Sequence, residues 1–435
     1  MSFLQDILQV IYAPKKAFKQ IISNPKYLGA LIVLLLFIGI QIGYEYIQFS
    51  KTYTEQTSPV IFFNGADLID ELPAYINASE WTGNTNVNLT NDFDDPFNYS
   101  IYLAGFGAPP TSPDGYYSIF GNSSLQMEAS NTNNVVAALS DTSNVDCSAA
   151  GFQNISMIIK LVSPQSAPQN ATVMLYSLGE TNFYTYDLTS QLSDSSTLGQ
   201  WNNLTVPVGP NAQGWATSGN PTWSNITSLV LNFNYPAGSD VTIRVGALFF
   251  RGLYLTPIAY GGLGIVIQFL QVFSLQFIFT WFILTGLIYG FCRVLKNAVL
   301  WKPLFVALGF AMFVMVIRAV VNIVATGTMQ NAYYPFDLSM GVRFDQFAAL
   351  YFPPEAVNSL FAFSQSAFQT INSSNAVFSG IVSVMAFVSY IWLGAMSVIV
   401  LGELKPEFTQ LKRMAFSAVG LAITILLLLF LVGII

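Results

Sequence analysis

Long apolar runs separate polar stretches along this chain of 435 residues. Five of the runs are long enough to cross a bilayer, because ~20 residues at ~1.5 Å each span a ~30 Å hydrocarbon core. They predict transmembrane helices over residues 27–47, 262–291, 303–326, 376–401 and 413–435.

The segment before the first run predicts a different kind of helix. Its apolar residues recur at helical spacing in two pieces, and Pro14 begins the second piece. Lysines fill the polar side, so residues 1–26 are expected to form cytoplasmic amphipathic helices that lie on anionic membrane lipids. No small-residue cleavage pattern ends the first run, which we therefore interpret as an uncleaved signal anchor.

The long polar insert after the first run changes its pattern part-way along. Residues 51–115 contain Pro, Asn and Gly without a regular period and predict a loop-rich extracellular collar. From residue 116 to 254, apolar residues recur at every second position, most clearly in 155–161 and 241–249. About eight such strands, with Gly, Pro, Asn and Ser turns between them, predict an antiparallel β-sandwich. The later segment 327–375 predicts a second extracellular loop with a short surface helix.

Charge is distributed unevenly between the runs. Residues 1–26, 292–302 and 402–413 hold ten basic and three acidic residues, whereas residues 51–257 hold four basic and sixteen acidic ones. Basic loops mark the cytoplasmic side of a membrane protein. The predicted fold class is therefore an α-helical polytopic protein of the plasma membrane with a cytoplasmic N-terminus. Its large inserted all-β, jelly-roll-like ectodomain and its C-terminus are predicted to be extracellular.

Glycosylation signals agree with this topology. Nine Asn-X-Ser/Thr sequons occur, and all of them lie on the predicted outer side. They predict N-linked glycans at Asn77, Asn88, Asn98, Asn122, Asn154, Asn170, Asn203, Asn225 and Asn372.

The composition indicates the kind of cell. Only 9% of the residues are charged, His is absent, and the two cysteines lie on opposite sides of the predicted membrane. A large exposed domain without disulfides, rich in Ser, Thr, Asn and Tyr, indicates an archaeal cell surface. The alternative is a eukaryotic endomembrane protein whose large loop lacks bridges.

Parts of the insert are similar to a known fold. The stretches YDL (186–188), WNNLTVPVG (201–209), PTWSNITSLVLNF (221–233) and VTIRVGALFFRG (241–252) resemble jelly-roll domains of the galactose-binding-like, carbohydrate-binding-module type. Many such modules hold a structural calcium ion with an acid in the last strand, but Gly246 stands near that place here. Candidates for stacking on sugar are Trp201, Trp215, Trp223, Phe183 and Tyr184; the alternative is that these aromatic residues fill the sandwich core.

The helices without the insert resemble a second family. The similarity to the Yip-type family of five-span membrane proteins rests on APKKAFKQIISNPKYLGALIVL (13–34), IYGFCRVLKNAVLWKPLFVAL (288–308) and YIWLGAMSVIVLGELKPEFTQLKRMAFSAVG (390–420). This resemblance implies a scaffold or adaptor that binds other membrane proteins, without catalytic residues. The long insert departs from the family, whose outer loops are commonly short.

Small and charged residues within the runs have predicted structural roles. Gly286 and Gly290 form a small-xxx-small pair, which predicts close approach of a neighbouring helix. Glu45 and Arg318 each lie about 24–27 Å along their helices at ~1.5 Å per residue, and therefore at similar depth near the outer interface. They predict an intramembrane ion pair or a shared polar network, because a lone charge at that depth is unfavourable.

Motifs for catalysis are missing from the sequence. Without His there is no His-based triad, and no phosphate loop or paired-Cys metal motif occurs. Asp92, Asp94 and Asp95 are compatible with calcium, but they match no complete calcium loop, and a solvated turn is the better interpretation. We therefore expect no enzyme, no cofactor and no metal site. Nucleic-acid binding is not expected either, because the basic patches face the inner leaflet.

Two classes of function remain. The first is a non-enzymatic glycoprotein acting as scaffold, adaptor or accessory subunit, whose sandwich binds an envelope protein, a membrane-complex subunit or a glycan. A carbohydrate-binding surface receptor is a variant of this class. The second is a transporter or transporter subunit, which the scarcity of ionisable residues in the runs disfavours.

Overall fold

The computed structural model divides the chain into two compact units. One unit holds residues 1–53, 256–332 and 371–435, and the other holds residues 54–255 and 333–370. The structure describes residues 3–59, 75–92, 124–193, 198–295, 299–335, 369, 371 and 373–431. The surface helix expected within 327–375 falls almost entirely outside them.

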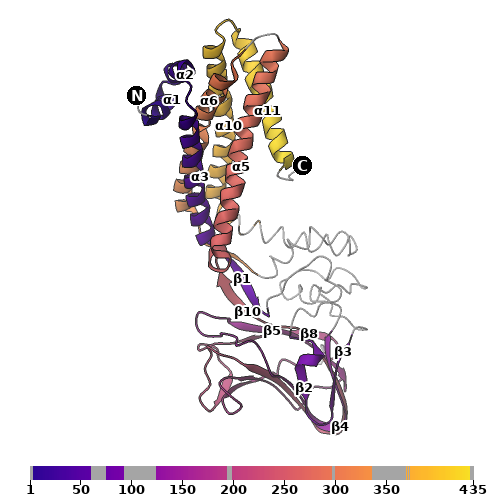
Figure 1. Cartoon of the computed structure of the whole chain (residues 1–435). Helices are drawn as coiled ribbons and strands as arrows, with labels where there is room; N and C mark the ends of the chain where they lie inside the picture. The colour runs from indigo at the N-terminus through magenta and orange to yellow at the C-terminus, as the bar shows by residue number, and fades with distance from the viewer. Residues whose placement is uncertain are drawn as a thin grey trace. The chain divides into compact units, whose positions relative to one another are not determined.

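The first unit is a bundle of α-helices (Figure 1). Its helices are α1 (Phe3–Tyr12), α2 (Pro14–Ser23), α3 (Tyr27–Ser50), α5 (Pro257–Val294), α6 (Trp301–Ala311), α7 (Phe313–Ala325), α10 (Ala376–Leu404) and α11 (Gln410–Leu431), with a 3₁₀ turn η2 (Thr326–Thr328). Within the described residues, five helical stretches are long and apolar enough to cross a membrane: Tyr27–Ser50, Gly264–Val294, Trp301–Thr328, Ala376–Leu404 and Gln410–Phe430. The five predicted runs are thus confirmed as helices.

Helices α1 and α2 pack against the bundle. Their apolar residues are buried in the same core as residues of α3 and α6, namely Ile7, Val10, Ala17, Phe18 and Ile21. Their apolar side therefore contacts protein, and the expected contact of their lysines with anionic lipids stays a prediction. Tyr12 remains 70% exposed at the end of α1.

Helices α3 and α6 pack closely against each other at Gly309. A Cβ atom added to Gly309 would lie 2.6 Å from the Cβ atom of Ala30 and 2.6 Å from the Trp281 ring. In contrast, nothing lies within 4 Å of a Cβ atom added to Gly286 or Gly290. The close approach predicted for these two glycines is therefore absent from the part of the chain that the structure describes; Gly309 provides it on another helix.

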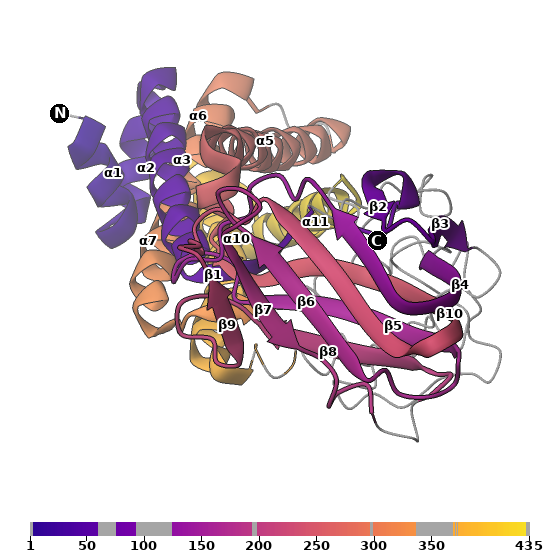
Figure 2. The ribbon, with the colours of Figure 1, turned by 90° about the horizontal axis from the view of Figure 1, so that it is seen from below.

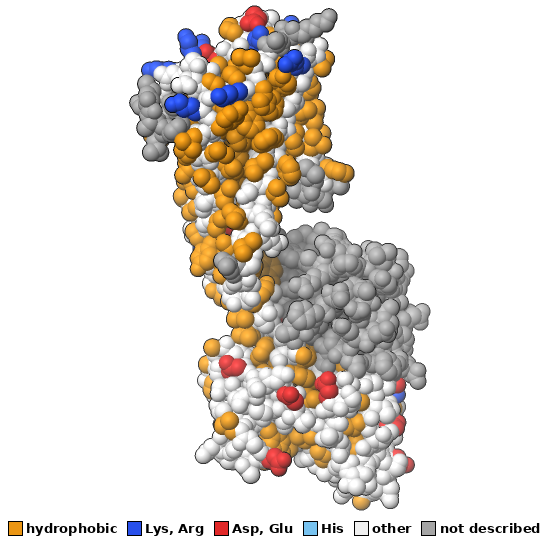
Figure 3. All heavy atoms as spheres, viewed as in Figure 1, with side chains coloured by type: hydrophobic (Ala, Val, Ile, Leu, Met, Phe, Trp, Pro, Cys, Tyr) orange, Lys and Arg blue, Asp and Glu red, His pale blue; other side chains and the backbone are white. Residues whose placement is uncertain are grey.

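The two ends of the bundle carry different polar groups. Lys and Arg side chains gather at the end that carries α1 and α2, while the sides of the helices are mostly hydrophobic (Figure 3). At the far end of α3, the ammonium group of Lys51 donates hydrogen bonds to the carbonyl oxygens of Thr326 (2.7 Å) and Met329 (2.8 Å). A cation at this position satisfies carbonyls left free where a helix ends. The assignment of the basic end to the cytoplasm stays a prediction.

The second unit is an antiparallel β-sandwich (Figure 2). Its strands are β1 (Thr52–Ser58), β2 (Trp81–Gly83), β3 (Val87–Asp92), β4 (Ser124–Leu139), β5 (Asn154–Ser163), β6 (Asn170–Tyr176), β7 (Phe183–Asp187), β8 (Trp201–Pro207), β9 (Trp215–Ser218), β10 (Ser228–Leu255) and β11 (Ala332–Tyr334), with a 3₁₀ turn η1 (Ala78–Glu80). The predicted fold class, a five-helix polytopic protein with an inserted all-β sandwich, is confirmed.

Strands β4 and β10 run through both layers of the sandwich. They turn near Asn131 and Gly238, whose φ angles of +51° and +81° lie in the left-handed region. Their two halves consequently pair with different strands. We name the layers sheet 1, with the order β2–β4–β10–β6–β7–β9, and sheet 2, with the order β3–β4–β10–β5–β8. Strand β1 extends sheet 2 beside the last residues of β10.

Alternate residues from both sheets fill the core between them. On β5 the inward residues are at most 1% exposed, as their two-residue period predicts: Ile155, Met157, Ile159 and Leu161. Strands β2 and β3 lie inside residues 51–115, where a loop-rich collar was predicted, and Trp81 and Leu89 pack on the core. Strand β1 lies in this range too, and most of residues 51–115 fall outside the described residues, so the collar itself stays a prediction. Strands of three and six residues at a sheet edge contain too few apolar positions to show a period.

Candidate functional site

The side of sheet 1 that points away from the core carries an aromatic pair. Because Val173 and Leu175 are buried in the core, alternation turns Met174 and Tyr176 outward. Strand register places Tyr176 opposite Phe183 of β7. Their ring centroids lie 5.1 Å apart, and the ring planes are inclined by 40°. Figure 2 looks onto this layer, with β6, β7 and β9 side by side.

Hydrogen-bonding groups lie further along the same face. Asn232 of β10 is the neighbour of Thr172 on β6, and Thr172 lies opposite Asp187 on β7. The Oδ1 atoms of Asn232 and Asn134 are buried and have no hydrogen-bond partner within the described ranges. Because buried carbonyl oxygens are nearly always paired, these two indicate unused acceptor capacity.

The carboxyl group of Asp187 is exposed and ionised. Hydrogen bonds from the side chain and the backbone N–H of Thr189 lower the pKa of Asp187 below its ordinary value. One carboxylate oxygen, Oδ1, accepts from the Thr189 backbone N–H at 2.8 Å. The carboxylate is therefore a fixed acceptor at the edge of the face.

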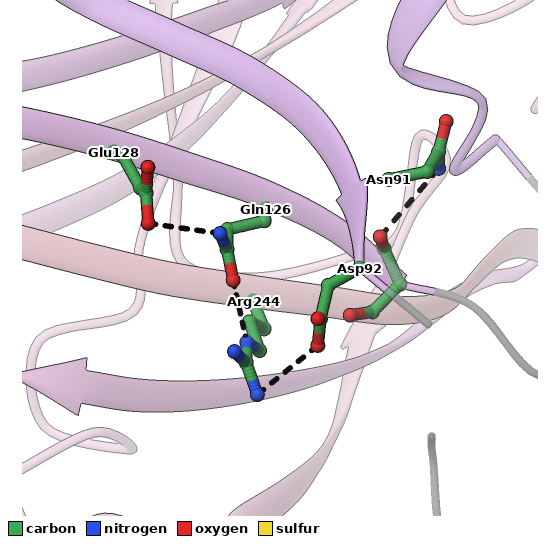
Figure 4. A network of polar contacts seen from close by, with 6 residues as sticks. Asn91, Asp92, Gln126, Glu128 and Arg244 are labelled. Carbon is green, nitrogen blue, oxygen red and sulfur yellow. Dashed lines mark hydrogen bonds and ion pairs between the residues drawn. The ribbon is translucent and has the colours of Figure 1, made fainter. Parts of the chain in front are cut away.

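The outward side of sheet 2 is buried in part, at Ile158 and Trp201, and differs in chemistry. Ile158 is fully buried although it points away from the core. Beside it, the Arg244 guanidinium donates to Oε1 of Gln126 at 2.8 Å and pairs with Asp92 at 3.1 Å (Figure 4). Gln126 in turn donates to Glu128 at 2.9 Å. This network joins β3, β4 and β10, so its charges stabilise the sheet.

The acidic stretch considered for calcium contributes to that network. Asp92 is 9% exposed and neutralised by Arg244, while Asp94 and Asp95 lie outside the described residues. In the part of the chain that the structure describes, no group of three His, Cys, Asp or Glu side chains could hold a metal ion.

Trp215 and Trp223, predicted as candidates for stacking on sugar, lie at one edge of the sandwich. The Trp223 ring stacks on Tyr184 with 3.8 Å between centroids, and Trp215 packs edge-on against both rings. The indole N–H of Trp215 donates to the Pro207 carbonyl of β8 at 2.7 Å, which joins sheet 1 to sheet 2. One face of Trp223 is thus taken by protein, which favours the core-filling alternative.

The remaining aromatic candidates divide between the two sheets. Trp201 lies on the outward side of sheet 2 and is only 7% exposed, with the Lys160 ammonium 5.9 Å from its ring centroid. Only Phe183 lies on the outward face of sheet 1. Its partner Tyr176 was missed, because residues 171–176 are almost equally apolar at even and odd positions and the pattern does not show which side faces out.

The sequon asparagines differ in exposure. Asn88 and Asn170 are exposed, whereas Asn77, Asn154, Asn203 and Asn225 are partly buried. Oδ1 of Asn203 is buried without a partner in the described parts of the chain. Asn98, Asn122 and Asn372 lie outside the described residues.

Glu45 and Arg318 do not form the predicted ion pair in the described part of the bundle. Instead, the side-chain amide of Gln41 donates to Oε1 of Glu45 at 3.3 Å. Arg318 faces a small cavity that Gln41 also lines. The shared polar network that the sequence also predicts for these two residues stays a prediction, with Gln41 lying between the Glu45 hydrogen bond and the Arg318 cavity.

Comparisons with known proteins find likenesses for the sandwich. No protein-family model matches the chain, and no curated protein does; the resemblance to the Yip-type family therefore has no such support. A family 11 carbohydrate-binding module from Clostridium thermocellum is 10% identical and covers 45% of this chain and 94% of its own length, with a TM-score of 0.24. A xylan-binding domain from Paenibacillus barcinonensis is 14% identical and covers 39% and 83%, with a TM-score of 0.20.

Enzymes also occur among the similar structures. An exo-β-agarase is 11% identical and covers 40% of this chain and 23% of its own length, with a TM-score of 0.27. At these identities and scores the likenesses carry no argument about function, which rests on the geometry above.

Proposed function

We propose that this protein is a membrane-anchored glycan-binding protein whose ligand lies across the outward face of sheet 1. The supporting observation is the Tyr176–Phe183 pair in the same face as Asn232, Thr172 and Asp187. Sugar rings present apolar C–H faces that pack on aromatic rings, and hydroxyl groups that pair with amides and carboxylates. The row of outward residues across three neighbouring strands suits an extended chain of sugars.

The helical unit anchors the sandwich at a cell surface in this proposal. The basic end of the bundle and the sequons of the insert support a cytoplasmic N-terminus, with the sandwich and the C-terminus outside. N-linked glycans decorate the outer side, and anionic lipids contact the basic end. The composition supports an archaeal plasma membrane.

A glycan panel tests the proposed site. The full-length protein in mild detergent is screened on immobilised polysaccharides, and the affinity for any ligand is measured by calorimetry. Tyr176→Ala should weaken binding about tenfold, because an aromatic contact contributes ~0.5–1.5 kcal/mol beyond its area and ~1.4 kcal/mol is a factor of ten. Asn232→Ala should weaken it similarly by removing a polar side chain from this face. Trp201→Phe, at a buried position of sheet 2, is the control and should bind as wild type.

Two outcomes would contradict the proposal. Binding that both Tyr176→Ala and Asn232→Ala leave unchanged would place the ligand elsewhere on the sandwich. No glycan binding, together with stoichiometric co-purification of other membrane or envelope proteins, would favour the scaffold or adaptor function instead.

A further inference from the structure

The helix bundle contains a cavity that is lined by both apolar and polar side chains. It has a volume of about 30 Å³ and opens between α3, α5, α7 and α10. Its apolar walls include Phe37, Phe277 and Met315, and its polar groups are Gln41, Gln276, Thr280, Arg318 and Tyr390. A single water needs roughly 10–15 Å³, so the cavity has room for about two waters or one small ion.

No acidic residue that the structure describes forms an ion pair with the Arg318 side chain that faces this cavity. Arg318 makes no hydrogen bond or ion pair with any residue that the structure describes, and its expected partner Glu45 is bonded to Gln41. A guanidinium among apolar helices is unfavourable unless water, a partner or a counter-ion compensates it. We therefore take the cavity as the place where water or a counter-ion compensates the charge of Arg318.

The other polar groups are mainly free donors. The amide of Gln276 and the hydroxyl of Tyr390 have no partner in the described part of the bundle, and Gln41 uses one amide hydrogen on Glu45. Thr280 is different, because its hydroxyl proton already goes to the Gln276 carbonyl at 2.7 Å. The guanidinium charge repels cations and attracts anions, while the Gln276 amide and the Tyr390 hydroxyl can turn their hydrogens toward a bound anion.

We propose that this cavity binds a small monovalent anion, of the size of chloride, with Arg318 as its counter-charge and Gln276 and Tyr390 as hydrogen-bond donors. The bound anion replaces the missing ion pair and holds three helices together at one point. This site is independent of the glycan-binding face of the sandwich.

Chloride titration of the full-length protein in detergent tests the site. Sodium chloride replaces sodium gluconate at constant ionic strength while thermal unfolding of the bundle is followed. The melting temperature of the wild type should rise with chloride and saturate, because a ligand that binds only the folded state stabilises it. Chloride NMR line broadening on the same samples measures binding independently of stability.

Variants separate the proposed ligands from the other lining residues. Arg318→Gln should abolish both the chloride-dependent stabilisation and the line broadening. If that variant does not fold, Gln276→Leu, which keeps the charge, should reduce the apparent affinity about tenfold. Thr280→Val is the matched control, and it should keep the wild-type chloride response. Absence of any response in the wild type, or an undiminished response in Arg318→Gln, would mean that the cavity holds water only.

Discussion

Glu55 and Arg251 form a two-point ion pair that ties strand β1 of the sandwich to strand β10. The guanidinium donates to Oε1 at 2.9 Å and to Oε2 at 2.8 Å, and the Gly252 backbone N–H donates to Oε1 at 2.8 Å. The Glu55 side chain is 3% exposed and that of Arg251 is 11% exposed. The pair therefore holds β1 in register beside β10 in a site that water scarcely reaches.

Breaking this pair should destabilise the sandwich strongly. Glu55→Ala leaves a buried guanidinium without its counter-charge, which costs about 3–5 kcal/mol of unfolding free energy. Pulse proteolysis of the detergent-solubilised protein, following cleavage within the sandwich, measures the loss. Glu128→Ala is the control, because Glu128 is exposed and its change should stay within about 0.5 kcal/mol. A loss as small for Glu55→Ala would mean that the pair contributes little.

Two buried tyrosines should make the sandwich sensitive to alkali. Burial raises the pKa of Tyr75 and of Tyr235 to about 12, against an ordinary value near 10. The folded state thus holds these protons more tightly than the unfolded chain. The stabilisation that comes from this tighter proton binding is fully present below pH ~10 and is lost as the pH rises to ~12. At ~1.4 kcal/mol per pKa unit, the loss is roughly 3 kcal/mol of unfolding free energy for each tyrosine.

Substitution with phenylalanine should separate the two tyrosines at neutral pH. The Tyr235 hydroxyl is buried without a partner in the described residues, so Tyr235→Phe should stabilise the sandwich by about 1 kcal/mol. The Tyr75 hydroxyl donates to the Thr142 carbonyl at 2.9 Å and lies 3.0 Å from the Ser58 hydroxyl, so Tyr75→Phe should destabilise it by about 1 kcal/mol. Urea unfolding at pH 7 and pH 11 measures both, and Tyr235→Phe should also lose less stability at pH 11 than wild type.

Substitution of alanine for two glycines of the bundle should have opposite effects on its stability. Gly309→Ala forces a methyl group against Ala30 and against the indole of Trp281, which is held by its hydrogen bond to the Phe305 carbonyl at 2.8 Å. Overpacking of this kind costs about 1–3 kcal/mol. Gly286→Ala meets no atom within 4 Å and should be neutral or stabilising by up to ~1 kcal/mol. Thermal melting in detergent compares them, and equal melting temperatures would contradict the close approach.

The fraction of molecules that carry a glycan at each sequon should follow the exposure of its asparagine. Asn88 and Asn170 are exposed and should carry glycans in protein from the native host, whereas Asn203, with its buried carbonyl oxygen, should be occupied least. Intact-glycopeptide mass spectrometry measures each site. The absence of glycans at both Asn88 and Asn170 would contradict the predicted topology.

Elements with a strong local pattern were predictable. The five apolar runs and the alternation from Ile155 to Leu161 depend only on the period of neighbouring residues, which a helix or a half-buried strand imposes directly. Strands β2 and β3 were not predicted, because Trp81 and Leu89 acquire their partners from β4, far along the chain.

The sequence by itself determined which segments are helices in an apolar phase, which are strands of a sandwich, and where charge and sequons lie. Only the tertiary structure decided which side chains meet. It joined Tyr176 to Phe183 across two strands, turned Trp215 and Trp223 onto each other, and left Arg318 facing a cavity without Glu45. The reason is physical: a period reports how often a residue faces the core, whereas a contact depends on strand register and rotamer, which are set by partners distant in the sequence.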